Sequence, residues 1–121
     1  MKIKMYQVDA FAEKLFTGNP AAVVILESSL KKNQMQSIAL ENNLSETAFV
    51  SINESPIYIR WFTPSIEVDL CGHATLASAR ILFEHYPELA GEEINFDSKS
   101  GILKVTKNKD ALCLNFPVDK P

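Results

Sequence analysis

Three short segments carry the side chains whose chemistry is most informative. The first is Cys71-Gly72-His73-Ala74, at the start of a segment with the composition of a buried helix. The first turn of a helix presents unpaired N–H groups and the positive end of the helix dipole, so a carboxylate or phosphate can bind there. Gly72 leaves room for the anion, His73 adds a proton donor, and Cys71 is a candidate thiolate with a lowered pKa. The plainer interpretation is that Cys71 and Ala74 pack in the core while His73 caps the helix.

The second segment contains a lone glutamate, Glu46, which follows Ser45 where a strand is expected to begin. A carboxyl group held in apolar surroundings resists ionisation and can act as general acid and base near neutral pH. Glu46 is therefore the candidate acid/base residue, with Ser45 beside it in a minor role. The alternative is a solvated glutamate at a helix–strand junction, which is the commoner case for a single glutamate.

The third segment is the turn Gly18-Asn19-Pro20. Glycine permits a positive φ, and proline pushes the residue before it out of the helical region. An asparagine held in such a turn can hydrogen-bond a substrate carboxylate or amide, although most such triplets are only turns. We expect no metal site, because Cys71 and His73 supply two ligands at most and the next candidates, Glu84 and His85, do not have zinc spacing.

The elements that must position these residues are mostly short strands. Apolar alternation or β-branched and aromatic composition predicts strands at 3–11, 21–26, 46–52, 57–63, 93–96, 101–106 and 111–116, with an extended segment at 66–70. The last two strands form a plausible hairpin. Apolar residues at helical spacing predict an amphipathic helix within 29–43, capped at its start by Ser28 or Ser29.

The second helix, over 72–86, is the most informative element. Its apolar residues point in all directions around the axis, and a helix that is apolar all round is buried on all sides. In a chain otherwise rich in strands, this predicts a helix enclosed by a curved sheet. The fold class expected is α+β, with a curved mixed sheet wrapped around one central helix.

Composition narrows the classes of function. The 121 residues have the length of one domain and can bury about two thirds of their surface. A formal charge of −3 without a basic cluster argues against nucleic acid and anionic membranes as partners. The longest apolar run, 21–26, is too short to cross a bilayer, and no signal-peptide pattern is present. We therefore expect a cytoplasmic location, with Cys71 and Cys113 as reduced thiols.

The order of several segments resembles the PhzF family of phenazine-biosynthesis-like isomerases. The matching blocks are Val8-Asp9-Ala10-Phe11, Phe16-Thr17-Gly18-Asn19-Pro20-Ala21-Ala22-Val23, Leu44-Ser45-Glu46-Thr47-Ala48-Phe49, Arg60-Trp61-Phe62-Thr63-Pro64 and Glu67 to Ala79. The family resembles a branch of the diaminopimelate-epimerase fold. That fold implies two similar lobes, each a curved sheet around a central helix, with the active site between them.

The resemblance also implies a chemistry, which is proton shuttling on a small carboxylated substrate without a cofactor. By position in the family motifs, Glu46 is the acid/base residue, Gly72 and His73 help to hold the substrate, and Asn19 lines the same cleft. In the related epimerases a catalytic cysteine lies at the equivalent helix start. Cys71 therefore resembles that cysteine, in a minor role. A racemase that uses Cys71 as one base ranks lowest, because the chain offers no second, opposed base.

The chain departs from the family in length. Family members are about twice as long, and their second lobe carries an Asp-Pro-x-Thr-Gly-Ser block that is not found here. We therefore expect residues 1–121 to form a single N-terminal lobe, either a fragment or a chain whose C-terminal lobe comes from another chain. Such a lobe is not expected to be active alone. The alternative function is a catalytically incomplete lobe that acts as a binding or assembly module, with a homodimer as the expected assembly.

Overall fold

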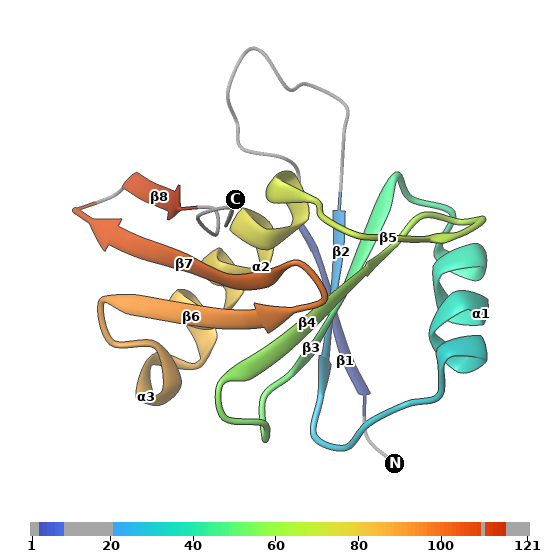
Figure 1. Ribbon diagram of the computed structural model, residues 1–121, viewed down its shortest axis with the longest axis horizontal. Helices are drawn as coiled ribbons and strands as arrows, with labels where there is room; N and C mark the ends of the chain where they lie inside the picture. The colour runs from blue at the N-terminus through green and yellow to red at the C-terminus, as the bar shows by residue number, and fades with distance from the viewer. Residues whose placement is uncertain (1–2, 9–20, 110, 116–121) are drawn as a thin grey trace.

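The computed structural model describes residues 3–8, 21–109 and 111–115 (Figure 1). Within these residues the strands form one sheet in the order β1-β2-β3-β4-β6-β7-β8, and β5 pairs with β4. The strands are β1 Ile3–Val8, β2 Ala21–Leu26, β3 Glu46–Ser51, β4 Ile57–Phe62, β5 Glu67–Val68, β6 Glu93–Ser98, β7 Gly101–Asn108 and β8 Ala111–Asn115. The helices are α1 Lys32–Asn42, α2 Gly72–His85 and α3 Pro87–Ala90.

The sheet is mixed and strongly curled. The β2–β3 and β4–β6 pairs are parallel, and the other neighbouring strands are antiparallel. Figure 1 shows β6 and β7 crossing the direction of β1 to β4, with α2 behind them and α1 on the far side of β3 and β4. This is the α+β fold predicted from the sequence, a curled mixed sheet around a central helix.

Alternation along the strands gives the sheet two apolar faces. The inner face packs on α2, and its core includes Val23, Val50, Ile59 and Trp61. The outer face packs on α1 through a smaller cluster of Val24, Leu26, Leu30, Met35, Ala39, Phe49 and Phe62. Successive residues of a strand point to opposite faces, so β2, β3 and β4 each contribute to both clusters.

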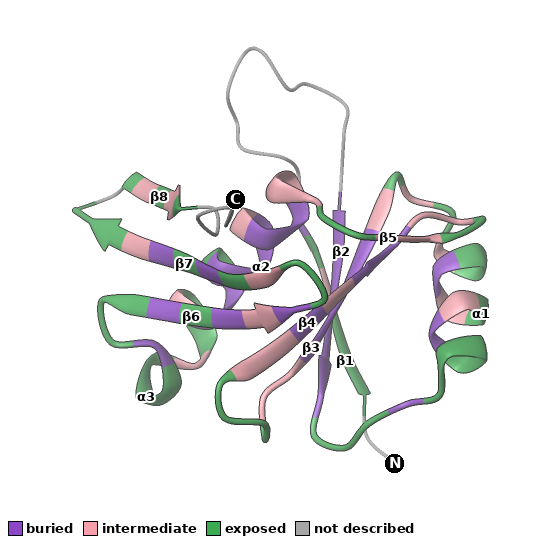
Figure 2. Ribbon diagram, in the orientation of Figure 1, coloured by how far each residue is buried: buried purple, intermediate pink, exposed green. Residues whose placement is uncertain are grey.

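Helix α1 is covered on one side only, as the amphipathic pattern predicted (Figure 2). It begins at Lys32, and its cap is Lys31 rather than Ser28 or Ser29. The backbone N–H of Lys31 donates to the Gln34 side-chain oxygen at 2.9 Å, which closes the first turn without a serine. The helix ends where Asn43 takes a left-handed backbone with φ 53°.

Helix α2 differs from its prediction on one side. Its sheet-facing residues are fully or nearly fully buried: Ala74, Thr75, Ala77, Ser78, Ala79, Ile81 and Leu82. However, Arg80 and Glu84 are exposed, and His73 and Leu76 are half-buried on the same stripe. Enclosure on every side was therefore wrong. The described sheet stays open between its edge strands β1 and β8, so a helix inside it keeps one uncovered side.

Several predicted boundaries shift slightly. The extended segment at 66–70 forms only the two-residue strand β5, and β6 and β7 each run two residues further than predicted. Pro87 ends α2 and also starts α3, where a residue without an N–H is tolerated in the first turn. The expected hairpin is confirmed as the antiparallel pair β7–β8. Residues 9–11 of the first predicted strand lie outside the described residues.

A buried hydrogen-bond chain attaches the start of α2 to the sheet. The Trp61 indole N–H donates to the Thr75 hydroxyl at 3.0 Å, and that hydroxyl donates to the Cys71 carbonyl at 2.7 Å. Both Trp61 and Thr75 are buried. These two hydrogen bonds fix the first turn of α2 relative to β4, because neither buried polar group can bond to water instead.

We expect Thr75→Val to destabilise the fold by about 1–3 kcal/mol, because it leaves the Trp61 N–H buried without an acceptor. Urea unfolding followed by tryptophan fluorescence measures this. The matched control is Thr106→Val in β7, since the structure gives the half-buried Thr106 hydroxyl no hydrogen bond to a described residue. Equal losses in the two variants would contradict the role assigned to Thr75.

Candidate active site

Glu46 opens β3 on the inner face of the sheet. It shares that face with Ala48 and Val50, which pack against α2. The residue is half-buried, and its carboxylate oxygen Oε1 is shielded from solvent and has no hydrogen-bond partner among the described residues. A buried carboxylate oxygen is normally paired, so an unpaired one is a feature that requires an explanation. A reactive group kept unpaired until substrate arrives is one such explanation.

The start of α2 supplies the second part of the site. Cys71 is the capping residue with an extended backbone, φ −146°, and Gly72 is the first helical residue. Thr75 donates its backbone N–H to the Cys71 carbonyl at 3.1 Å, which is the first helical pair of α2. The preceding N–H groups of such a turn lie outside the helical pairing, and they make this end of the helix electropositive.

The charge of Glu46 acts on the Cys71 thiol at the start of α2. Burial is the main cause that raises the pKa of the Cys71 thiol, and the Glu46 charge raises it further. The backbone N–H groups of Ala74 and His73 act in the opposite direction and are outweighed. The Cys71 pKa is therefore raised, whereas the sequence suggested a lowered pKa and a thiolate. Burial and a nearby carboxylate dominate over the helix dipole.

The other predicted site residues have different positions. His73 and Gly72 are half-buried at the helix start beside Cys71, and Ser45 is exposed just before β3. Asn19 lies outside the described residues. The structure thus brings the Glu46 carboxylate, the Cys71 thiol and the Gly72-His73 turn to one end of the inner face. In the part of the chain that the structure describes, no three His, Cys, Asp or Glu side chains are grouped as a metal site would need.

Residues that the sequence reasoning missed hold this arrangement in place. Trp61 and Thr75 anchor the helix start, and Arg60 binds Glu67 through two hydrogen bonds of 2.8 and 2.9 Å. The four-residue spacing of Thr75 from Cys71 permits a hydroxyl bond back along the helix, but the Trp61 partner depends on how β4 meets α2. No pattern in the sequence pairs Arg60 with Glu67. Within the described residues, no helix is long and apolar enough to span a membrane.

Comparison with known proteins shows which protein family the chain resembles. The sequence model of a family described as "Phenazine biosynthesis-like protein" matches residues 8–120. An uncharacterized isomerase of Pseudomonas aeruginosa is 52% identical over 121 residues, which are 100% of this chain and 46% of that protein. The fold is that of PhzF-like and epimerase-like proteins.

Solved structures of related proteins have the same fold as this chain. The crystal structure of a phenazine biosynthesis protein of the PhzF family from Enterococcus faecalis gives a TM-score of 0.83 at 54% identity, over 93% of this chain and 43% of that one. A predicted epimerase from Pseudomonas aeruginosa gives a TM-score of 0.68 at 27% identity, over 89% and 40%. The chain belongs to the PhzF family of phenazine-biosynthesis-like proteins. It spans about half the length of the relatives that it matches.

Alkylation of Cys71 by iodoacetamide tests the proximity of Glu46. In a Cys113→Ser background, Glu46→Gln should lower the Cys71 pKa, because it removes a negative charge that raises it. The pH profile of alkylation should then shift to lower pH, since the thiolate is the reactive form. Glu41→Gln, which removes an exposed carboxylate from the last turn of α1, is the control. Identical pH profiles for the two variants would show that the Glu46 charge does not act on Cys71.

Proposed function

We propose that this chain is the N-terminal lobe of a PhzF-like isomerase that moves a proton on a small carboxylated substrate without a cofactor. The observation that carries the proposal is the unpaired, shielded Oε1 of Glu46 beside the start of α2. Membership of the family and the match to 43% of the length of a solved PhzF-family structure support it. Glu46 is the proposed acid/base residue.

The chemistry follows from where the groups lie. A substrate carboxylate bound at the Gly72-His73 turn would meet the positive end of the α2 dipole, which favours an anion. The adjacent carbon would then face Glu46. The ionised carboxylate would take a proton from that carbon, and the resulting acid would return it at another carbon. Ser45 and Cys71 have minor roles in this proposal, and Asn19 is assigned only through the family motif.

One lobe supplies only one wall of such a site. Two surface hollows in the described part of the chain, of about 290 and 650 Å³, contain none of Glu46, Gly72 or His73 in their linings. Neither hollow therefore contains the proposed site, and we assign its second wall to another lobe. Catalysis of this kind depends on donors placed around the reacting atoms and on exclusion of water. We propose that residues 1–121 are one lobe and that a second lobe closes the site.

A chimaera tests the function. This chain would replace the matching segment of the Enterococcus faecalis PhzF-family protein, to which it is 54% identical. Exchange of carbon-bound protons for deuterium in D₂O, followed by ¹H NMR over a panel of small unsaturated and amino carboxylates, reports proton transfer. We expect exchange with at least one compound, and we expect Glu46→Gln to reduce its rate by at least about 100-fold, the usual range for a general acid/base.

The control for the chimaera is Glu41→Gln, which removes an exposed carboxylate and should leave the exchange rate unchanged. The isolated chain should show no exchange above background. A Glu46→Gln chimaera that keeps the full rate would overturn the assignment of Glu46. Full exchange by the isolated chain would overturn the need for a second lobe.

A second candidate function is a binding or assembly module, and one observation favours it. Ile66 and Leu70, just before the start of α2, are 60% and 41% exposed, and Met5 on the edge strand β1 is 52% exposed. Apolar side chains of this size on one lobe are suited to a protein partner. A second copy of this chain or a separate C-terminal lobe is the proposed partner. A cytoplasmic location, without nucleic acid or membrane as partners, remains our expectation from the sequence.

Sedimentation equilibrium tests the assembly. We expect the average mass to rise above the 13.5 kDa of one chain at micromolar concentration, because the exposed apolar residues gain from burial. The double variant Ile66→Ser, Leu70→Ser should remain monomeric at the same concentration. Lys109→Ser, in the β7–β8 turn, is the control and should associate like the parent chain. A parent chain that stays monomeric throughout would refute self-association.

A further inference from the structure

The hollow of about 650 Å³ lies where two strands of the sheet separate. Its walls are the turn between β3 and β4, helix α3 and the first half of β6. Strands β4 and β6 pair only at Ile57↔Phe96 and Tyr58↔Asp97, so the earlier residues of β6 have no neighbouring strand on that side. None of the candidate active-site residues lines this hollow.

The backbone of β6 leaves three polar groups unpaired along the hollow. The Glu92 C=O accepts a hydrogen bond from the Lys107 N–H at 2.9 Å, and in an antiparallel pair the bonded residues alternate. Ile94 therefore bonds to β7, whereas the N–H and C=O groups of Glu93 and Asn95 point away from β7. Among the described residues, the two N–H groups and the Glu93 C=O have no backbone partner. These groups form a short open edge within the sheet.

An unpaired strand edge can bind an extended peptide, whose own N–H and C=O groups continue the hydrogen-bond ladder. In an intact sheet a neighbouring strand does this, but here the turn before β4 lies in its place, and Pro56 of that turn has no N–H to donate. An added strand can occupy only the stretch before Phe96, where β4 begins to pair with β6. The edge therefore suits a peptide of about three residues rather than a full-length strand.

The wall on the inner side of this edge is apolar. Ile94 is buried, and Ile52 and Ile57 are half-buried. Leu89 of α3 completes the wall and is 40% exposed. Residues that lie opposite each other on neighbouring strands point to the same face, so a peptide residue opposite Ile94 would point to this wall. An apolar side chain there would extend the inner-face core to which Ile94 belongs.

The outer rim of the hollow is acidic. Glu54 and Glu93 line it, and no lysine or arginine is among its lining residues. Glu93 alternates with Ile94 along β6, so its side chain points to the outer face. The Asn95 amide donates to the Glu93 carboxylate at 3.1 Å and holds it there. Lys104 approaches Glu93 only to 3.8 Å, and both side chains are nearly half exposed, so this pair leaves the carboxylate open to another cation.

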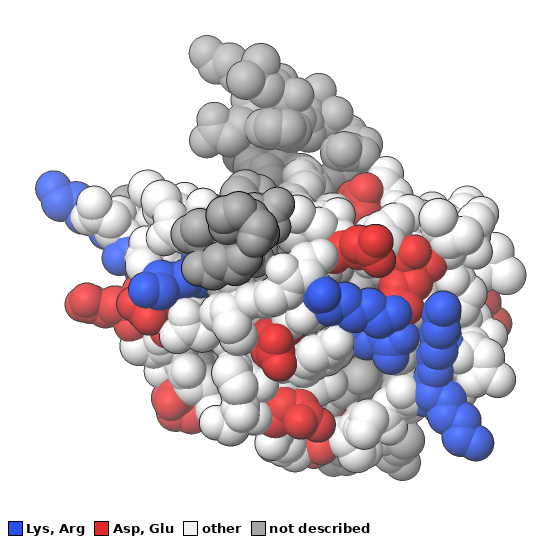
Figure 3. Space-filling view, in the orientation of Figure 1, with Lys and Arg blue, Asp and Glu red and all other residues white. Residues whose placement is uncertain are grey.

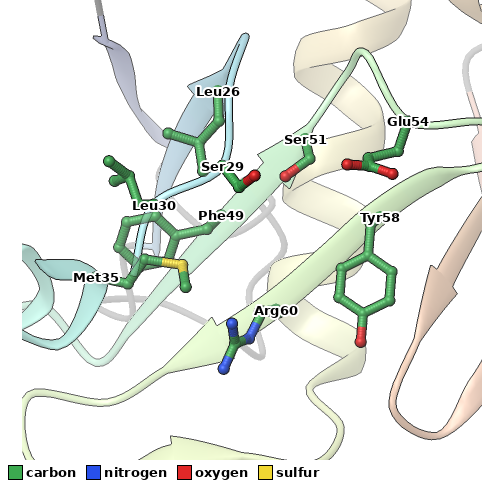
Figure 4. Close-up of a pocket in the computed structure, with 9 residues that line it drawn as sticks. All are labelled: Leu26, Ser29, Leu30, Met35, Phe49, Ser51, Glu54, Tyr58 and Arg60. Carbon is green, nitrogen blue, oxygen red and sulfur yellow. The ribbon is translucent and has the colours of Figure 1, made fainter. Parts of the chain in front are cut away.

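Acidic and basic side chains are separated on this side of the molecule. Figure 3 shows acidic side chains over α3 and the turn between β3 and β4, whereas the basic ones gather beside α1 and near the end of β7. Glu54 also lines the smaller hollow beside α1, and Figure 4 shows its carboxylate directed toward Ser51 there. The basic group beside α1 surrounds the carboxylate of Glu67, and its members are Lys32, Arg60 and Lys99.

The alternation along β6 assigns a charge to each position of the added peptide. Peptide residues opposite Glu93 and Asn95 would point to the acidic outer rim. Opposite charges on neighbouring strands attract each other, so these two positions suit lysine or arginine. The position between them faces the apolar wall. The sequence that fits the edge is therefore basic, apolar, basic.

We propose that this hollow binds a short extended segment of a partner protein, with the pattern basic–apolar–basic, as an added strand beside β6. Its backbone pairs with Glu93 and Asn95, and its apolar side chain packs on Ile94. Its basic side chains face Glu93 and Glu54. The proposal goes beyond the isomerase function and does not depend on it. The surface is also separate from the apolar residues before α2 to which we assign self-association.

Titration of the ¹⁵N-labelled 121-residue chain with acetyl-Lys-Leu-Lys-amide, followed by NMR, tests the proposal. We expect saturable shifts of the Glu93 and Asn95 backbone amides. Two control peptides are acetyl-Glu-Leu-Glu-amide, which reverses both charges, and the fully N-methylated Lys-Leu-Lys peptide, which cannot donate to the Glu93 C=O. Each should bind at least about 10-fold more weakly, because each loses charge-assisted or backbone hydrogen bonds. Either control binding as tightly as acetyl-Lys-Leu-Lys-amide, or no saturable shift, would overturn the proposal.

Variants locate the site. Glu54→Lys, which reverses an exposed charge on the rim, should weaken binding of the Lys-Leu-Lys peptide at least about 10-fold. Leu89→Ser should weaken it at least about 3-fold, because it removes hydrocarbon from the apolar wall. Glu41→Lys and Leu40→Ser, at exposed positions of α1, are the matched controls and should bind like the parent chain. Equal binding by Glu54→Lys and Glu41→Lys would refute the site. Shifts at Glu93 that appear when the chain is concentrated without peptide would identify a second copy as the occupant and refute a partner peptide.

Discussion

The fit of α2 inside the curled sheet is the constraint on which the rest of this lobe depends. Small residues at Ala74, Ala77, Ser78 and Ala79 let the strands approach the helix axis, and all of them are fully buried. The hydroxyl of Thr75 then fixes the position of the helix relative to β4, because it accepts a hydrogen bond from Trp61 and donates one to the Cys71 carbonyl. A larger side chain in this row would push the sheet outward and displace the helix start from Glu46.

The position of the candidate active site follows directly from that fit. The start of α2 is electropositive and lies beside the first residue of β3, so an anion held by one would be within reach of a carboxylate held by the other. The same proximity keeps Cys71 protonated, because its thiol is buried near a negative charge. Glu46, rather than the thiol, is therefore the residue of this end to which the proposed function assigns proton transfer.

Alternation along β3 and β4 gives the two faces of the sheet different sets of side chains. Glu46 and Trp61 point inward to α2, whereas Ser51 and Arg60 point outward to the hollow beside α1. A change of one residue in register would exchange these sets. The inner face is closed by core packing and ends in the candidate site. The outer face is only partly covered by α1, and it carries the charge cluster around Glu67.

The sequence by itself determined the strand order along the chain, the two long helices, the curled α+β architecture and the family. Each of these depends on apolar periodicity or on local motifs, such as Leu44 to Phe49 and Glu67 to Ala79, and both are patterns of residues near one another in the sequence. Only the tertiary structure decided that the Cys71 pKa is raised, that one stripe of α2 with Arg80 stays uncovered, and that Arg60 faces Glu67 at the end of a hollow. Each of these depends on the distance between groups on different strands and helices, and on how far the sheet curls, which no local pattern encodes.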